Sequence, residues 1–253
     1  MAVHVRYIKA IPWPGKGWRI QWSVGGLEPT DEIVLERSSS PEGPWDEVAL
    51  LPYNVISFED EWPTNRSFFS EWYYRIRVGS TESVPVCSKE SGSLVTNEII
   101  RQHEAILKGM NGRPGYMSAH FACYKRTLQG TKCHYCRDKV TGEIIISKCD
   151  VCKGVGYIEG WSNPVKFYGR WLTPIHRVTQ LSNFENEEEG RTMAMAAYPI
   201  IEPGDVLAEK GTGKVYRVRQ VTSVEPNNIV ISQNIVCSLI NRDFIESKLE
   251  FPE

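Results

Sequence analysis

The chain has 253 residues, of which 41% are hydrophobic and 24% are charged, with 8 Trp and 11 Tyr. This length and composition are typical of two or three folded domains and exclude a disordered or fibrous chain. The net charge of −2 and the pI near 6.3 argue against a protein whose main partner is nucleic acid, because such proteins usually carry an excess of Lys and Arg.

Nothing in the sequence indicates export or a membrane partner. No apolar run approaches the roughly 18 residues that are needed to span a bilayer. Residues 1–7 lack the basic start and the continuous apolar core of a signal peptide. We therefore expect a protein that is made in a reducing cytoplasm, where cysteines spaced as Cys-x-x-Cys favour metal binding over disulfide formation.

Residues 1–90 predict a small β-sandwich. Residues 18–24 alternate apolar and polar side chains, as expected of a strand with one buried face. Further strand-like segments, separated by turn residues, are 3–11, 32–37, 45–50, 55–60 and 72–78. Six or more short strands in fewer than 90 residues are typical of a sandwich.

This region resembles a fibronectin type III domain over residues 3–88. The resemblance rests on Trp22, on the hairpin at residues 36–45, and on residues 72–78, which are similar to the strand that carries the tyrosine corner in that family. It implies a binding or spacer module without an active site. Besides Trp22, the tryptophans of this region are Trp13, Trp18, Trp45, Trp62 and Trp72. They cannot all be central in so small a core, so some should pack at its rim, and one or two could instead form a docking surface for another subunit.

Residues 91–130 are predicted to form a linker helix and a connector. Apolar side chains recur at helical spacing from residue 94 to residue 110, and residues 111–115, rich in Gly with a Pro, should end the helix. Thr96 is the expected N-terminal cap. His103 lies on the apolar stripe, where we interpret it as a packing residue and not as a metal ligand.

Two Cys-x-x-Cys pairs occupy the middle of the chain. They are Cys133 with Cys136 and Cys149 with Cys152, and 12 residues separate the pairs. Four thiolates within reach of one ion suit tetrahedral Zn²⁺. Residues 131–171 are therefore predicted to form a Cys₄ zinc ribbon with a flanking hairpin, in which residues 144–146 are the returning strand. A closed Cys₄ site has no open coordination position, so the predicted Zn²⁺ is structural.

The predicted ribbon is close to neutral, which argues against direct nucleic-acid binding. Between Lys132 and Lys153 there are five basic and three acidic side chains. Four thiolates with one Zn²⁺ offset that surplus of cations, and counterion release needs several surplus cations on one face. We prefer a structural role, with nucleic-acid binding and a redox pair as the alternatives. His134 lies inside the first pair and is expected to point outward, away from the metal.

Residues 161–171 are rich in aromatic side chains and include Lys166 and Arg170. We interpret this segment as a hairpin packed on the ribbon. The alternative is that its rings stack on single-stranded bases, because aromatic side chains interleaved with cations suit that purpose.

Residues 172–253 predict a small β-barrel of about five strands, such as an OB- or SH3-like barrel. Residues 180–191 contain four glutamates and are expected to be a solvated loop. Residues 237–246 are predicted to form a short helix. The whole chain is thus expected to be mainly β and multidomain, with a sandwich, a linker helix, a zinc ribbon and a barrel in that order.

No motif in the sequence indicates catalysis. There is no Gly-x-Ser-x-Gly, phosphate-binding loop or paired-carboxylate motif, and His176 has no nucleophile motif near it. Cys87, Cys123 and Cys237 have no partner at metal-ligand spacing, so we expect buried free thiols. The chain is therefore predicted not to be an enzyme.

From about Leu94 to the C-terminus, the chain resembles a family of tailed-bacteriophage virion proteins. The resemblance is carried by residues 130–136, 149–157 with Gly160, 203–207, 215–218 and 231–233. In that family a zinc ribbon joins a helix to a terminal β-barrel, and the proteins occur in the neck or tail without enzymatic activity. The family commonly has Gly-Thr-Gly after the last cysteine, whereas this chain has Gly154-Val155-Gly156.

The resemblance implies a virion-located structural subunit of a phage neck or collar that assembles in a ring at the head-to-tail connector. Its partners would be copies of itself and neighbouring virion proteins, and its Zn²⁺ would hold the joint between domains. One alternative is a baseplate or tail component of the same particle. Another, from a different class, is a zinc-ribbon nucleic-acid-binding protein.

Overall fold

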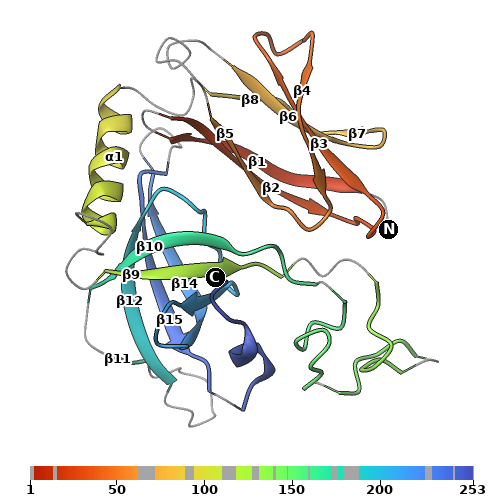
Figure 1. Cartoon of the computed structure of the whole chain (residues 1–253), viewed down its shortest axis with the longest axis vertical. Helices are drawn as coiled ribbons and strands as arrows, with labels where there is room; N and C mark the ends of the chain where they lie inside the picture. Colours follow the sequence, from red (N-terminus) through yellow and green to blue (C-terminus); the bar gives the residue numbers. More distant parts are fainter. Residues whose placement is uncertain are drawn as a thin grey trace.

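The computed structural model describes residues 3–13, 16–61, 72–88, 94–109, 118–126, 131–138, 141–146, 148–158, 160–172, 176–178, 188–225, 230–241 and 243–252. Within these residues the protein is mainly β, and it folds as several sheets in two β-domains with an α-helix beside them (Figure 1). This confirms the predicted mainly β, multidomain fold. The described part of the chain contains no helix with the length and hydropathy to cross a membrane.

The N-terminal domain is a β-sandwich of two antiparallel sheets. One sheet has the order β1 (His4–Trp13), β2 (Gly17–Gly25) and β5 (Ser57–Glu61). The other has the order β4 (Asp46–Pro52), β3 (Glu32–Ser38), β6 (Tyr73–Val78) and β7 (Thr81–Glu82), and β8 (Val86–Cys87) also pairs with β6. The hydroxyl of Tyr74 in β6 donates a 2.7 Å hydrogen bond to the Asp60 carboxylate in β5, which links the two sheets.

Strand β2 is buried on both faces, whereas its alternating sequence predicted one buried face. Trp18, Ile20 and Trp22 lie in the sandwich core. Arg19 and Gln21 point the other way but are only 8% and 1% exposed, because the helix and the second domain cover them. The predicted single buried face is therefore wrong for β2: alternation shows which face is polar but not whether another domain packs on that face.

The second domain is a closed six-stranded antiparallel barrel. Its strands follow the order β10 (Val165–Trp171), β9 (Ser118–Tyr124), β13 (Val206–Glu209), β14 (Val215–Val224), β15 (Ser232–Leu239) and β12 (Glu188–Ala196). Pairing of β10 with β12 closes the barrel, and β11 (His176–Val178) pairs with the start of β12 on the same edge as β10. Gly169 permits the closure, since a Cβ there would lie 2.3 Å from the sulfur of Met193, which is fully buried inside the barrel.

The barrel takes strands from outside the predicted range of residues 172–253. Strands β9 and β10 belong to it, and the cysteine-containing segment is inserted between them. The predicted hairpin of residues 161–171 on the ribbon is therefore wrong, because β10 pairs with β9 and β12 instead. The pairing of Phe121 with Phe167 spans the whole insertion, so no local pattern in the sequence could reveal it.

Two local predictions in the C-terminal third also need correction. Of the helix predicted at residues 237–246, residues 237–239 are the end of β15, and a short 3₁₀ helix follows at Ile245–Lys248. Of the predicted acidic loop at residues 180–191, residues 188–191 are part of β12, and residues 180–187 lie outside the described residues.

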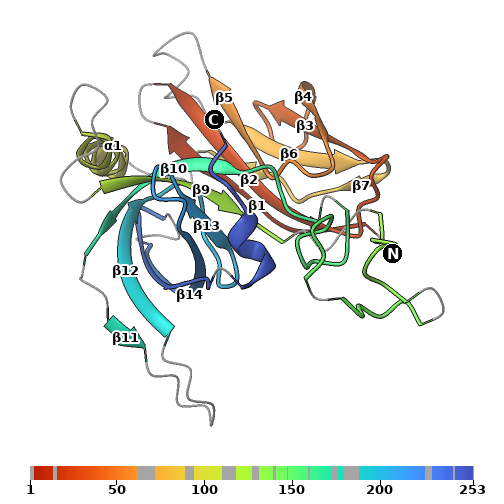
Figure 2. The same cartoon turned by 60° about the horizontal axis from the view of Figure 1, so that its bottom comes forward.

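Helix α1 (Leu94–Lys108) lies beside both domains, on one side of the joint between them (Figures 1 and 2). It begins two residues before Thr96, so Thr96 is not its N-terminal cap. A small apolar cluster joins the three parts: Ile11, Ile100, Ala197, Tyr198, Ile200 and Val230. At its rim the Arg19 guanidinium lies 4.7 Å from the ring of Trp13 and 4.8 Å from that of Tyr198, and it forms a 2.6 Å ion pair with Glu104 of the helix.

Two buried glutamines hold the backbone that crosses this joint. The side chain of Gln21, from the sandwich, accepts a 2.9 Å hydrogen bond from the Ile200 N–H and donates a 3.0 Å bond to the Ile200 carbonyl. Gln233, from the barrel, accepts from the Ile201 N–H at 2.9 Å and donates to the Pro199 carbonyl at 2.7 Å. Because this backbone is removed from water, each of its polar groups needs such a partner.

We predict that Gln21→Ala lowers the free energy of unfolding by about 2 kcal/mol or more, because it leaves both polar groups of Ile200 buried without a partner. Urea unfolding of the full chain measures this change. Asn54→Ala is the matched control at the same joint, since the Asn54 amide makes only an exposed 3.4 Å bond to Asn163. Equal effects of the two substitutions would contradict the role assigned to Gln21.

Candidate metal centre

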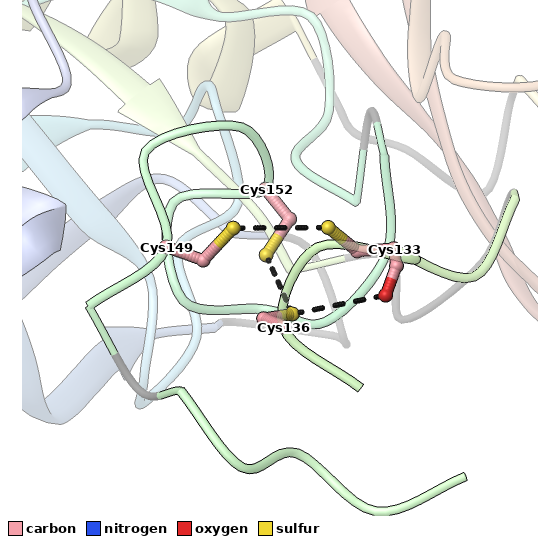
Figure 3. A group of neighbouring side chains, drawn as sticks. All are labelled: Cys133, Cys136, Cys149 and Cys152. Carbon is pink, nitrogen blue, oxygen red and sulfur yellow. Dashed lines mark hydrogen bonds between the residues drawn. The ribbon is translucent and has the colours of Figure 1, made fainter. Parts of the chain in front are cut away.

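The four predicted ligand cysteines come together in the insertion between β9 and β10. Figure 3 shows their sulfur atoms directed toward one another from two facing turns. The turns are joined by backbone hydrogen bonds, among them that from the Cys133 N–H to the Gly156 carbonyl at 3.0 Å. Residues 144–146, predicted as a returning strand, make only a single isolated bridge, between Ile144 and Arg137, so that prediction is wrong in its detail.

The sulfur positions fit one tetrahedral metal ion. The Sγ atoms of Cys133 and Cys149 lie 3.7 Å apart, those of Cys136 and Cys152 lie 3.5 Å apart, and all four lie within 4.8 Å of one another. Four sulfurs around an ion at about 2.3 Å would be separated by about 3.8 Å, whereas a disulfide needs about 2.05 Å. All four cysteines are buried. These residues can therefore hold a metal ion.

The electrostatics of the cluster favour a bound cation. Burial, followed by the neighbouring sulfurs Cys152 and Cys133, raises the pKa of the Cys136 thiol. Burial opposes ionisation of Cys149 as well, but the backbone N–H groups of Cys152 and Val151, together with hydrogen bonds from the Cys152 and Cys133 side chains, outweigh it and lower the pKa of that thiol to about 7. Four adjacent thiolates repel one another, so a cation that takes the place of their protons is what allows all four to ionise together.

The backbone around the sulfurs supports the site. The Gly156 N–H donates a 3.2 Å hydrogen bond to the Cys152 sulfur, and the Gly156 carbonyl accepts a 2.8 Å bond from Nε of Arg137. Gly156 has a φ of +81°, which glycine adopts without strain. The same arginine donates to the Gly142 carbonyl at 2.6 Å, so one side chain connects the loop that carries the second cysteine pair to the turn between the pairs.

The insertion is fixed to the barrel wall. Val155, Tyr157 and Trp161 pack with Ala122, Val206 and Ala208 of β9 and β13, and with Leu249 and Phe251 near the C-terminus. An ion pair between Lys248 and Asp150 adds a contact at the far side. Helix α1 lies on the opposite side of the barrel (Figures 1 and 2). A metal here would therefore stabilise the segment that connects β9 to β10. The joint between sandwich and barrel is formed mainly by other residues.

Neither His134 nor His103 joins the cluster. His134 is exposed, in agreement with its predicted outward orientation. The centroid of its ring lies 4.1 Å from that of the Tyr135 ring. His103 is partly buried on α1, and the side chain of His176 lies outside the described residues. Cys87, Cys123 and Cys237 are free and buried, as predicted.

One buried charge cluster was not predicted from the sequence. Lys125 and Asp205, 7% and 5% exposed, form a 2.9 Å ion pair, and Glu202 accepts from the same ammonium group at 2.6 Å. Burial opposes the charge on Lys125, but the Asp205 carboxylate together with Cys123, Tyr7 and Glu202 outweighs it, so the pKa of Lys125 is raised. The cluster borders a cavity of about 440 Å³ between sandwich and barrel. Its single ammonium group is paired directly with both carboxylates, so we interpret the cluster as part of the joint.

Comparisons with known proteins do not place the chain in a family. No protein-family model, curated protein or solved structure matches it. The structure itself shows a mainly β protein with a closed barrel and one four-cysteine site, among the described residues, that could hold a metal ion. The function must therefore be argued from these features.

We predict that the reduced protein binds about one Co²⁺ per chain, with the absorption band of thiolate-to-cobalt charge transfer, because four thiolates surround one position. Cys149→Ser should weaken this binding strongly. Cys87→Ser is the control, since Cys87 is buried in the sandwich and far from the cluster. Unchanged titration of Cys149→Ser would contradict the site.

We predict that Gly156→Ala speeds metal loss to a chelator by about tenfold or more, as is typical when a partner of a metal ligand is displaced. A Cβ at Gly156 would lie 2.6 Å from Ile144 and strain the backbone that donates to Cys152. Gly142→Ala is the matched control. Gly142 also has a positive φ, of +72°, but a Cβ there meets nothing within 4 Å, so its effect should be smaller.

Proposed function

We propose that this protein is a non-enzymatic structural subunit of a tailed-bacteriophage particle, in the neck or collar at the head-to-tail connector, and that it assembles in a ring. The proposal rests on the resemblance of residues 94–253 to virion proteins with a zinc ribbon and a terminal barrel. The arrangement of β-domains joined by buried hydrogen bonds supports it, because a subunit that is repeated in a particle must hold its contact surfaces in fixed directions.

We further propose that the metal is Zn²⁺ and that its role is structural. Four buried sulfur ligands suit Zn²⁺, and four protein ligands leave no position for water or substrate. The insertion is too short to build a core of its own, so the metal supplies the stability that apolar packing does not.

The exposed side chains of the insertion support a role in assembly. Several large apolar residues around the metal site face solvent in this chain: Tyr135, Ile144, Ile145, Ile146 and Val151. Of these side chains, Ile145 is 65% exposed and Tyr135 is 61% exposed. Grouped apolar side chains on a small surface are typical of a contact with another protein.

The alternative role as a baseplate component is supported by the same features of the fold and the site. The position of the protein in the particle distinguishes the two roles. Labelling the protein within purified particles and locating the label by electron microscopy decides between them. Native mass spectrometry of the purified protein provides an independent test, in which a ring of identical chains with one Zn²⁺ each is the expected result. A protein found free in infected cells but absent from purified particles would exclude both virion roles.

We predict that Cys149→Ser blocks incorporation into particles while the sandwich remains folded, because loss of the metal loosens the insertion that carries the exposed apolar surface. Incorporation is measured by the ratio of this protein to a major capsid protein in purified particles. Cys87→Ser should be incorporated as the wild type is. Normal particles with the Cys149→Ser protein at full occupancy would show that the metal is dispensable for assembly.

A further inference from the structure

Strands β9 and β10 present a mixed aromatic and basic surface on the outer wall of the barrel. Along β10 the side chains alternate, so that Phe167 and Trp171 are buried inside the barrel while Lys166 and Arg170 are exposed. Tyr168 lies between the two cations on the same outer face. The residue opposite Tyr168 on β9 is His120, which places a second ring beside it.

The two rings form a flat stack. The centroids of His120 and Tyr168 are 4.3 Å apart, and their planes differ by only 5°. The ring of Phe251, from the C-terminal segment, leans on His120 with a centroid distance of 4.7 Å and an angle of 60°. Tyr168 is half-buried, so part of its ring remains open to solvent. We call His120, Tyr168 and Phe251 the ring platform.

Cationic side chains surround the ring platform. The amines of Lys166 and Lys210 lie 5.3 Å and 5.4 Å from the Phe251 centroid, and Arg170 follows two residues after Tyr168. Burial and then the positive charges of Lys210 and Lys166 lower the pKa of His120. No ion pair with a described carboxylate is formed by Arg170 or Lys210. The platform therefore lies in a locally positive field, although the whole chain is slightly acidic.

A groove of about 250 Å³ begins at the platform and runs toward the sandwich. Tyr168, Lys166, Lys108 and Trp13 line it, so rings and cations continue along the groove. The carboxylates of Glu59 and Glu104 also line it, but both are held by Arg19, at 3.1 Å and 2.6 Å. The groove is large enough for one planar ring system and too small for a folded partner.

We infer that the ring platform and this groove bind single-stranded nucleic acid. An unpaired base stacks on the exposed part of Tyr168, and the phosphates pass the cations Lys166, Arg170, Lys210 and Lys108. Proteins that bind single strands combine a positive track for the backbone with aromatic rings on which bases stack. Duplex DNA cannot use such a platform, because its bases are already stacked on each other. The insertion that carries the cysteines is a poorer site for a single strand, because it is near neutral and its described rings do not form a flat stack.

The test uses the full metal-loaded chain and a fluorescent oligothymidylate of about 10 nucleotides, with anisotropy as the readout at low salt. We expect binding to the single strand and much weaker binding to the corresponding duplex. Tyr168→Ala should weaken binding by about fivefold or more, as loss of one stacked base predicts, whereas Tyr168→Phe keeps the ring and should change it little.

The cations provide a second, independent readout. Arg170→Ala combined with Lys210→Ala should lower the slope of log affinity against log salt by about 1.4, or about 0.7 for each lost phosphate contact. Lys148→Ala removes an exposed cation from the insertion and is the matched control, which should leave the slope unchanged. Circular dichroism and metal content confirm that each variant is folded.

Four results would overturn the inference. They are the absence of binding to the oligonucleotide, equal affinity for duplex and single strand, equal loss on Tyr168→Ala and Tyr168→Phe, and a loss on Lys148→Ala as large as that on the paired substitution. Displacement of the oligonucleotide by polyglutamate of equal charge at equal affinity would assign the surface to acidic peptides instead. Incorporation into particles is measured separately, so this inference and the proposed virion role can fail independently.

Discussion

The architecture depends on the requirement that backbone buried between two domains keeps its hydrogen bonds. Residues 197–201 run between the sandwich and the barrel, where Ala197, Tyr198, Ile200 and Ile201 are all buried. Gln21 from one domain and Gln233 from the other satisfy that backbone. Since each glutamine fits only one register of its partner, these bonds fix how the domains meet, while the surrounding apolar side chains supply most of the burial energy.

The cysteine insertion cannot rely on apolar packing for its stability, and its four sulfurs offer a metal site instead. It lacks enough apolar residues to form a core, and several of its large apolar side chains face solvent. Four sulfurs within 4.8 Å of one another allow a single ion to replace that core. The inner side of the insertion, at Val155 and Trp161, still packs on the barrel. With an ion bound, the cysteine cluster would hold an apolar surface outward at a fixed place on the barrel.

The sequence could predict features that depend on neighbours close in the chain. The spacing of Cys133, Cys136, Cys149 and Cys152 is enough to identify the site, and alternation is enough to find most sandwich strands. The sequence could not show that β9 and β10 pair across the insertion, because that pairing leaves no pattern in neighbouring residues. Nor could it show that Lys125 and Asp205 meet, since 80 residues of chain separate them, although the Pro203-Gly204 turn marks a tight bend just before Asp205.

The same contrast between local and overall properties applies to charge. A net charge of −2 describes the whole chain, whereas a ligand meets only one face. Many carboxylates are used inside the protein: Glu36 binds Arg75 and Arg77, and Glu246 binds Arg126 and Arg217. A carboxylate held between two arginines presents little negative charge to an approaching partner. Arg170 and Lys210 form no such pair with a described carboxylate, so a slightly acidic protein can still present a positive face.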